Sequence, residues 1–220
     1  MSKLKLVVLL CAAVAVPARG VSAQSCLGLP SFVAGSVHLN AAGEFPQDAK
    51  TYAVGIGAGR PNNLFGNLGA GQVAYDLFSE KATYGFLEFG YQIPISMAQL
   101  CPIAGGSYSI GPDDEAAGIK VKAPGATAGL ALGLPISFGV FQLIPNAGVR
   151  YEYAAVTTEE AGASIKETFG NGVVDVGLGF VIFDRISIQP IARIRFGGDS
   201  NDRTLGVFAA FSFPWRADDF

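Results

Sequence analysis

The sequence predicts an all-β fold: a closed, antiparallel, up-and-down transmembrane β-barrel of about ten strands, with eight as the alternative count. Three observations predict it. Stretches such as ISIQPIARIRF, residues 186–196, alternate apolar and polar side chains with the period of two that is typical of a strand. The chain is 50% hydrophobic, yet beyond its first residues no segment approaches the ~20 consecutive apolar residues of a membrane helix. Charged residues gather between the alternating stretches rather than on their apolar faces.

The first residues have the build of a secretory signal peptide. Lys3 and Lys5 precede an apolar run over residues 6–16, and small residues up to Ala23 offer a cleavage site. Residues 1–23 are therefore expected to be removed, and residues 24–220 to form one outer-membrane β-barrel domain. Cys26 and Cys101 then remain, in a compartment that permits disulfides. The acidic balance argues against nucleic acid as a partner.

Each proposed strand has one face of large apolar residues and one face of small or polar residues. In the third strand, Val73 and Tyr75 are assigned to the apolar face, which puts Gln72 and Asp76 on the other. The interior of such a narrow barrel has no room for the large residues, so they are expected to face lipid. The expected strands are 31–42, 51–59, 69–78, 83–93, 98–110, 125–138, 140–156, 172–183, 186–196 and 204–215.

The connections alternate in length and charge, which predicts short periplasmic turns, longer outer loops and both chain ends in the periplasm. The expected short turns are 60–68, 94–97, 138–140 and 184–185. An aromatic girdle near strand ends is expected from Tyr151, Tyr153, Phe196, Phe213 and Trp215. The other connections are expected to carry Glu44, Asp48, Lys50, Glu80, Lys81, Asp113, Asp114, Glu115, Lys120, Lys122, Glu159, Glu160, Lys166, Glu167, Asp199, Asp202 and Arg203.

Prolines in or beside the strands argue against a closed barrel, because it has no edge strand to tolerate a missing N–H donor. All of them fall toward the expected periplasmic ends, so we interpret them as irregularities of the rim, where bulges gather. Pro145 and Pro190 would lie deepest. The full set is Pro94, Pro102, Pro135, Pro145, Pro190 and Pro214.

The polar strand faces carry charges that are expected to form a network in the lumen. Because buried charges need partners, a paired polar plug is favoured over a solute pathway or an acid–base site. No catalytic, cofactor-binding or metal-ligating set is predicted, since no Ser-His-Asp spacing or cluster of Cys, His and carboxylate is present. A disulfide between Cys26 and Cys101 is expected across the barrel mouth. The predicted lumen network is His38, Asp76, Glu88, Arg150, Glu152, Asp175, Arg193 and Arg195.

Together with the signal peptide and the alternating strands, the aromatic last strand, Phe211-Ser212-Phe213, and the terminal Phe220 carry a resemblance. The chain resembles the small outer-membrane β-barrel proteins of Gram-negative-type bacteria, the group that includes the OmpA barrel and OmpX. It departs from the usual ending, because Asp218 and Asp219 stand beside Phe220. The resemblance implies outer-membrane lipid around the protein, the barrel-assembly machinery as its partner during biogenesis, and no cofactor. It leaves the oligomeric state open.

Three functions are compatible with this sequence. The favoured one is a non-enzymatic outer-membrane barrel with a structural or adhesive role, or with a minor, porin-like role in small-solute transport. The second is an outer-membrane enzyme acting on lipid or peptide, centred on His38, the single histidine, and on a carboxylate such as Asp76. The third is a soluble periplasmic barrel that binds an apolar ligand inside.

Overall fold

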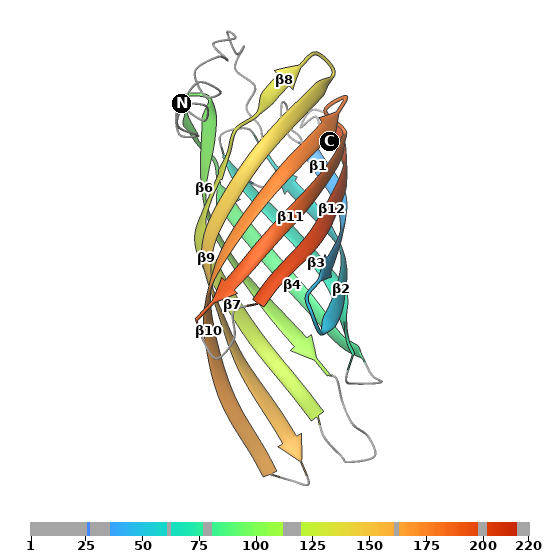
Figure 1. Cartoon of the computed structure of the whole chain (residues 1–220), viewed down its shortest axis with the longest axis vertical. Coiled ribbons are helices and arrows are strands. Elements are labelled where there is room, and N and C mark those ends of the chain that lie inside the picture. The colour runs from blue at the N-terminus through green and yellow to red at the C-terminus, as the bar shows by residue number, and fades with distance from the viewer. Residues whose placement is uncertain are drawn as a thin grey trace, which may run out of the picture.

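The protein is a closed antiparallel barrel, as the sequence predicts (Figure 1). It has ten positions around the ring, which we call staves, and each is filled by one strand or by two consecutive strands. The computed structural model describes residues 26, 36–60, 63–76, 81–111, 120–160, 163–197 and 202–214. The predicted signal peptide (1–23), Trp215 and Phe220 lie outside the described residues. The strands are β1 (Ser36–Phe45), β2 (Ala49–Gly59), β3 (Leu64–Tyr75), β4 (Lys81–Tyr91), β5 (Ile93–Ile95), β6 (Ala98–Ile110), β7 (Lys120–Gly133), β8 (Ile136–Phe138), β9 (Phe141–Glu160), β10 (Ala163–Ile182), β11 (Ile186–Phe196) and β12 (Asp202–Pro214).

Twelve strands make ten staves because two of them are short continuations. β4 and β5 both pair with β6, and β7 and β8 both pair with β9. Each stave pairs with the next along the chain, and β12 pairs with β1 to close the ring. Ser36, which begins β1, and Pro214, which ends β12, lie at the end of the barrel that carries the β2–β3, β5–β6, β8–β9 and β10–β11 turns. We call this end the turn end, and the opposite end is the loop end (Figure 1).

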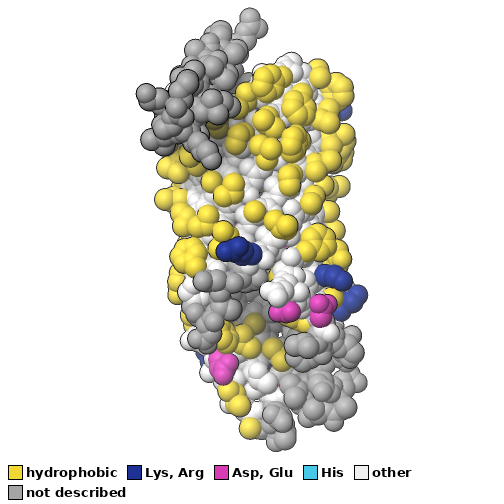
Figure 2. All heavy atoms as spheres, in the orientation of Figure 1, with side chains coloured by type: hydrophobic (Ala, Val, Ile, Leu, Met, Phe, Trp, Pro, Cys, Tyr) yellow, Lys and Arg dark blue, Asp and Glu magenta, His cyan; other side chains and the backbone are white. Residues whose placement is uncertain are grey.

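Large apolar side chains cover the outside of the barrel. Figure 2 shows them over most of the visible wall, with charged side chains gathered toward the loop end. A continuous apolar surface of this extent is not stable in water, so it faces lipid. The soluble-barrel alternative required these side chains inside and is therefore wrong. Every stave contributes exposed residues to this surface, among them Leu39, Val54, Leu68, Leu87, Tyr108, Leu130, Val149, Val176, Ile194 and Val207.

No described residue belongs to a helix that is long and apolar enough to cross a membrane.

The prolines interrupt the hydrogen-bonded ladder without shifting it. Pairing stops opposite Pro102 between β4 and β6, at Pro124 between β7 and β9, and at Pro190 between β10 and β11. Pro135 and Pro145 face the gap between β7 and β8. Beyond each gap the register continues unchanged, and Pro102, Pro124, Pro145 and Pro190 keep pairing with their other neighbour. The expectation of bulges is thus wrong at these gaps: each proline lacks one N–H donor, and the loss stays local.

β9 and β10 are much longer than the expected strands. They stay paired from Phe141↔Ile182 to Glu160↔Ala163, whereas β10 pairs with β11 only from Gly172 onward. The hairpin therefore projects past the ends of β11 and β12 at the loop end (Figure 1). The expectation of a loop between 156 and 172 is wrong, because charge was taken as a sign of a loop, and charged residues also occupy paired strands outside the membrane.

β3 starts earlier than expected and presents the opposite face to the lumen. Gln72 is exposed on the outside, whereas Val73 and Tyr75 line the interior. Asp76 follows the strand as an exposed turn residue at the loop end. Its place in the predicted lumen network is therefore wrong, and a facing error of one residue explains it, since such a slip reverses every side chain of a strand.

Candidate functional site: the polar lumen

The turn-end part of the lumen is filled by neutral polar side chains. His38 and Asn40 on β1 are buried, and His38 lies against Gly57 of the neighbouring strand. Asn40 Nδ2 donates to Asn67 Oδ1 at 2.9 Å, across Gly55, where an added Cβ would stand 2.7 Å from Asn40 Oδ1. Glycines on β2 therefore make room for bulky polar groups from β1 and β3.

The disulfide closes a small apolar cluster at the same end. Cys26 and Cys101 are bonded, with their Cα atoms 6.2 Å apart and a separation of 75 positions in the chain. Both are buried together with Phe65, Ile103 and Ala131. The expected disulfide is thus present and is fixed to the inner face of β6. The rest of the segment that was expected to enter the barrel mouth, residues 24–30, lies outside the described residues.

Six charged side chains from β1, β9, β10 and β11 form one continuous ion-paired chain on one side of the lumen. Arg193 Nη1 lies 2.7 Å from both carboxylate oxygens of Glu44, and Arg193 Nε lies 2.6 Å from Asp175 Oδ1. Arg150 Nη2 lies 3.2 Å from Asp175 Oδ2, and Arg150 Nε lies 3.0 Å from Glu152 Oε1. Arg195 Nε completes the chain at 3.3 Å from Glu152 Oε2. We call this set the charge chain: Glu44, Arg193, Asp175, Arg150, Glu152 and Arg195.

Small residues give the charge chain its space. An added Cβ at Gly129 would collide with Arg150, its partner on β9. An added Cβ at Gly206 would stand 3.1 Å from Glu44 Cγ, so Glu44 crosses this glycine of β12 toward Arg193. Sequence reasoning placed Glu44 in a loop and missed its role, because β1 runs three residues further than expected.

The predicted network therefore divides into separate parts. Arg150, Glu152, Asp175, Arg193 and Arg195 meet in the charge chain. The other three residues do not join it: His38 lies near the turn end, Glu88 faces the cavity described below, and Asp76 lies outside the lumen.

His38 and Asp76 are not brought together. His38 stands in line with Gly57 and then with Asn67 on β3, and Asp76 lies nine residues beyond Asn67 toward the loop end. At about 3.3 Å per residue this is roughly 30 Å along the strand. A hydrogen-bonded His–Asp pair cannot form over that distance. The His38–Asp76 pair that the enzyme hypothesis proposed is therefore absent from the structure.

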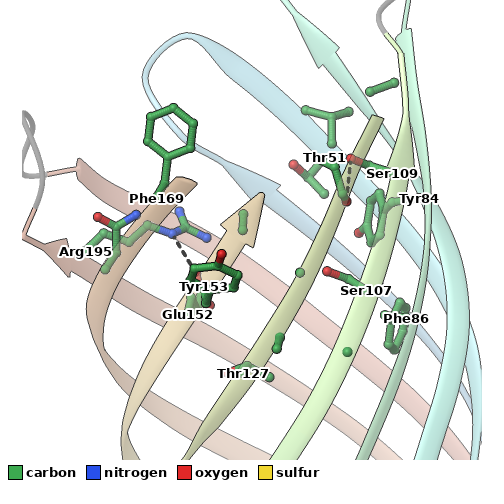
Figure 3. Close-up of a pocket in the computed structure, with 18 of the residues that line it drawn as sticks. Thr51, Tyr84, Phe86, Ser107, Ser109, Thr127, Glu152, Tyr153, Phe169 and Arg195 are labelled. Carbon is green, nitrogen blue, oxygen red and sulfur yellow. Dashed lines mark hydrogen bonds and ion pairs between the residues drawn. The ribbon is translucent and has the colours of Figure 1, made fainter. Parts of the chain in front are cut away.

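The loop half of the lumen contains a cavity of about 430 Å³. One wall carries Tyr84 and Phe86 of β4, and the opposite wall carries Glu152, Arg195 and Phe169, as Figure 3 shows. Hydroxyl groups of Thr51, Ser107, Ser109 and Thr127 complete the lining, together with Glu44, Glu88 and Arg193. Across the described residues, no group of three or more His, Cys, Asp or Glu side chains could hold a metal ion.

Comparison with protein-family models and with curated proteins finds no match to this chain. Among solved structures, the beta domain of the Bordetella autotransporter BrkA is similar with a TM-score of 0.51 and 13% identity, over 82% of this chain and 100% of that chain. The Ail protein of Yersinia pestis has a TM-score of 0.42 at 12% identity, over 82% and 97% of the two chains. The N-terminal barrel domain of OprF from Pseudomonas aeruginosa has a TM-score of 0.40 at 12% identity, over 81% and 97%.

These observations define the class of protein. A closed barrel satisfies its backbone hydrogen bonds without water, the exterior is apolar, and the lumen is polar, which together are the properties of a transmembrane barrel of the outer-membrane type. The likeness to the BrkA domain supports the same fold. More particularly, the chain is a small ten-stave barrel whose lumen holds a charge chain between a disulfide-bound cluster and a cavity.

Proposed function

We propose that this protein is a non-enzymatic, non-conducting barrel in the outer membrane of a Gram-negative-type bacterium, with a structural and adhesive role at the cell surface. The observation that carries the proposal is the charge chain. It lines the side of the lumen formed by β9, β10, β11 and β1, and its arginine side chains are only 13–27% exposed. Displacing these side chains to widen the lumen would break their ion pairs and leave buried charges without partners.

The β9–β10 hairpin supports the adhesive part of the proposal. Residues 163–171 of β10 pair with β9 on one side and have no strand partner on the other within the described residues. An unpaired edge of this kind can bind an extended segment of another protein through its main-chain N–H and C=O groups. Ile165 and Phe169 add exposed apolar side chains to the same hairpin.

Single-channel recording tests the alternative of small-solute transport. The full protein, reconstituted in planar lipid bilayers, is expected to show no large, stable conductance, because the charge chain narrows the lumen on one side and buried polar side chains fill it toward the turn end. An Arg193→Ala/Arg195→Ala variant removes two of its cations and is expected to conduct more. A large, stable conductance of the unmodified protein would contradict the proposal and favour a porin-like role.

Cell fractionation tests the location and the orientation. We expect the protein in the outer-membrane fraction, released by detergent but not by high salt. A cysteine introduced at Lys166, on the projecting hairpin, should react with a membrane-impermeant maleimide on intact cells. The matched control is a cysteine at Arg185, in the β10–β11 turn, which should react only after the membrane is opened. The reverse pattern would contradict the orientation on which the adhesive role depends.

A further inference from the structure

One carboxylate of the lumen remains outside the charge chain. Among the described side chains that form the charge chain or line the cavity, Arg150, Arg193 and Arg195 stand against Glu44, Glu88, Glu152 and Asp175, three positive against four negative. The three arginines are ion-paired with Glu44, Asp175 and Glu152. Within the described residues Glu88 makes no hydrogen bond or ion pair, and Arg150 and Arg193 act on it only through their longer-range charge.

Two hydroxyl-bearing residues of the next strands, Ser107 and Thr127, line the same cavity as Glu88. Glu88 stands opposite Gly105 of β6, and Gly105 stands opposite Thr127 of β7. Thr127 Oγ1 is buried and has no hydrogen-bond partner among the described residues. Ser107, the next inward residue of β6, lies between Phe86 and Gly125, and Figure 3 shows it in the cavity beside Tyr84 and Phe86.

Gly105 separates Glu88 and Thr127 in this row. An added Cβ at Gly105 would stand 2.7 Å from Leu87 O and 3.1 Å from Thr127 Cγ2, so only glycine leaves the Thr127 side chain its place. Glu88 and Thr127 are two strand spacings apart, roughly 10 Å between their Cα atoms. Both side chains line the cavity, so a small polar group in it can lie between them.

Two aromatic rings form the adjoining wall. Phe86 lies against Gly69 and Tyr84 against Gly71, where an added Cβ would collide with either ring. The ring centroids are 6.2 Å apart, and the planes are tilted by 35°. The rings are thus supported from behind by β3, and they border the cavity next to Glu88. Aromatic faces attract cations electrostatically and also bury alkyl chains.

We propose that the floor of this cavity, formed by Glu88, Thr127 and Ser107, binds the ammonium group of a small primary alkylamine, whose alkyl chain lies against Tyr84 and Phe86. An ammonium group has three N–H donors and no acceptor, which matches one carboxylate and two hydroxyl oxygens. An anion is disfavoured, because these three arginines are ion-paired to carboxylates and carboxylates outnumber arginines by one among the seven groups. This binding site goes beyond the proposed structural and adhesive role and does not depend on it.

Calorimetric titration of the full protein in detergent micelles tests the site. Butylammonium is expected to bind saturably, and better than butanol, butyrate or tetramethylammonium, which lack the charge, reverse it or lack the N–H donors. Glu88→Gln keeps the shape of the side chain, and it should weaken butylammonium binding about tenfold or more, as expected for a charged hydrogen bond. Thr127→Val should weaken it about two- to tenfold, as expected for a neutral one.

The matched control is Glu159→Gln, which removes a carboxylate outside the cavity that is paired with Lys122. It should leave butylammonium affinity unchanged. The folded state of each variant is verified by its heat-dependent mobility on gels. The proposal is overturned if folded Glu88→Gln binds butylammonium as the parent does, if the parent does not bind it, or if any of the three comparison ligands binds equally well or better.

Discussion

Replacing Arg193 by Met should destabilise the barrel more than any comparable change at its surface. The Arg193 side chain is 13% exposed and is held by Glu44 at 2.7 Å and by Asp175 at 2.6 Å. Met keeps the apolar length of the side chain, but it leaves Glu44 without an ion-pair partner among the described residues. Asp175 keeps Arg150. Removing one partner of a buried ion pair costs about 3–5 kcal/mol, and we expect a loss of that size.

The matched control is Lys122→Met. Lys122 pairs with Glu159 at 3.2 Å, but both side chains are nearly half exposed, at 44% and 46%. Such pairs contribute at most about 1 kcal/mol. Equilibrium folding into lipid vesicles against urea, followed by circular dichroism and gel mobility, measures both variants. Adding Glu44→Gln to Arg193→Met should recover part of the loss, because the unpaired charge is removed. If the two single variants lose equal stability, the assigned role of the charge chain is wrong.

Two further predictions concern the wall and the disulfide. Val149 is 51% exposed on the lipid face, so Val149→Arg should reduce folding stability in vesicles by about 2–4 kcal/mol if it lies near the midplane. Gly148→Ser should have a mild effect, because an added Cβ would stand 3.5 Å from its nearest neighbour. Equal effects of the two substitutions would contradict the assignment of Val149 to the lipid face. Non-reducing mass spectrometry of protein taken directly from the envelope should find Cys26 joined to Cys101. Loss of the bond should cost roughly 4–5 kcal/mol in the chain-entropy model, and two free thiols would contradict it.

Strand faces could be predicted wherever large apolar residues alternate strictly with small or polar ones. In β11, Ser187 and Gln189 are buried while Ile188 and Ile194 are exposed, as the sequence predicts. Charged side chains are disfavoured on the face of such a strand that contacts lipid, so the alternation itself indicates which side chains face lipid and which face the lumen. In β3 the signal is ambiguous, because both faces hold small residues.

The glycines of β3 indicate which face of this strand points into the lumen, whereas its apolar residues do not. Gly69 and Gly71 share a face with Val73 and Tyr75, and the rings of Phe86 and Tyr84 lie on that face. Glycine is needed where a ring from the next strand lies against the backbone. An apolar residue on the same face as two such glycines therefore points inward, which the apolar pattern alone does not reveal.

The composition of the lumen could be predicted from the sequence, but its pairing could not. Arg193 and Glu44 are 149 residues apart and meet only because β12 pairs with β1. Closure of the barrel predicts that these strands are neighbours. It does not give the register, Ser36↔Pro214, which decides the residues that stand at one level. A strand that ended at residue 42 would also have left Glu44 outside.

The same reasoning explains why the cavity floor was not found in the sequence. A count of lumen charges predicts near balance, and five of the eight residues predicted for the network do meet in the charge chain. Because Glu44 pairs with Arg193, each of the three described lumen arginines, Arg150, Arg193 and Arg195, is paired with a carboxylate other than Glu88. An unpaired carboxylate is thus a property of the register and not of the composition. In a narrow barrel, the residues that pair set its stability, whereas those left without partners are where a ligand can bind.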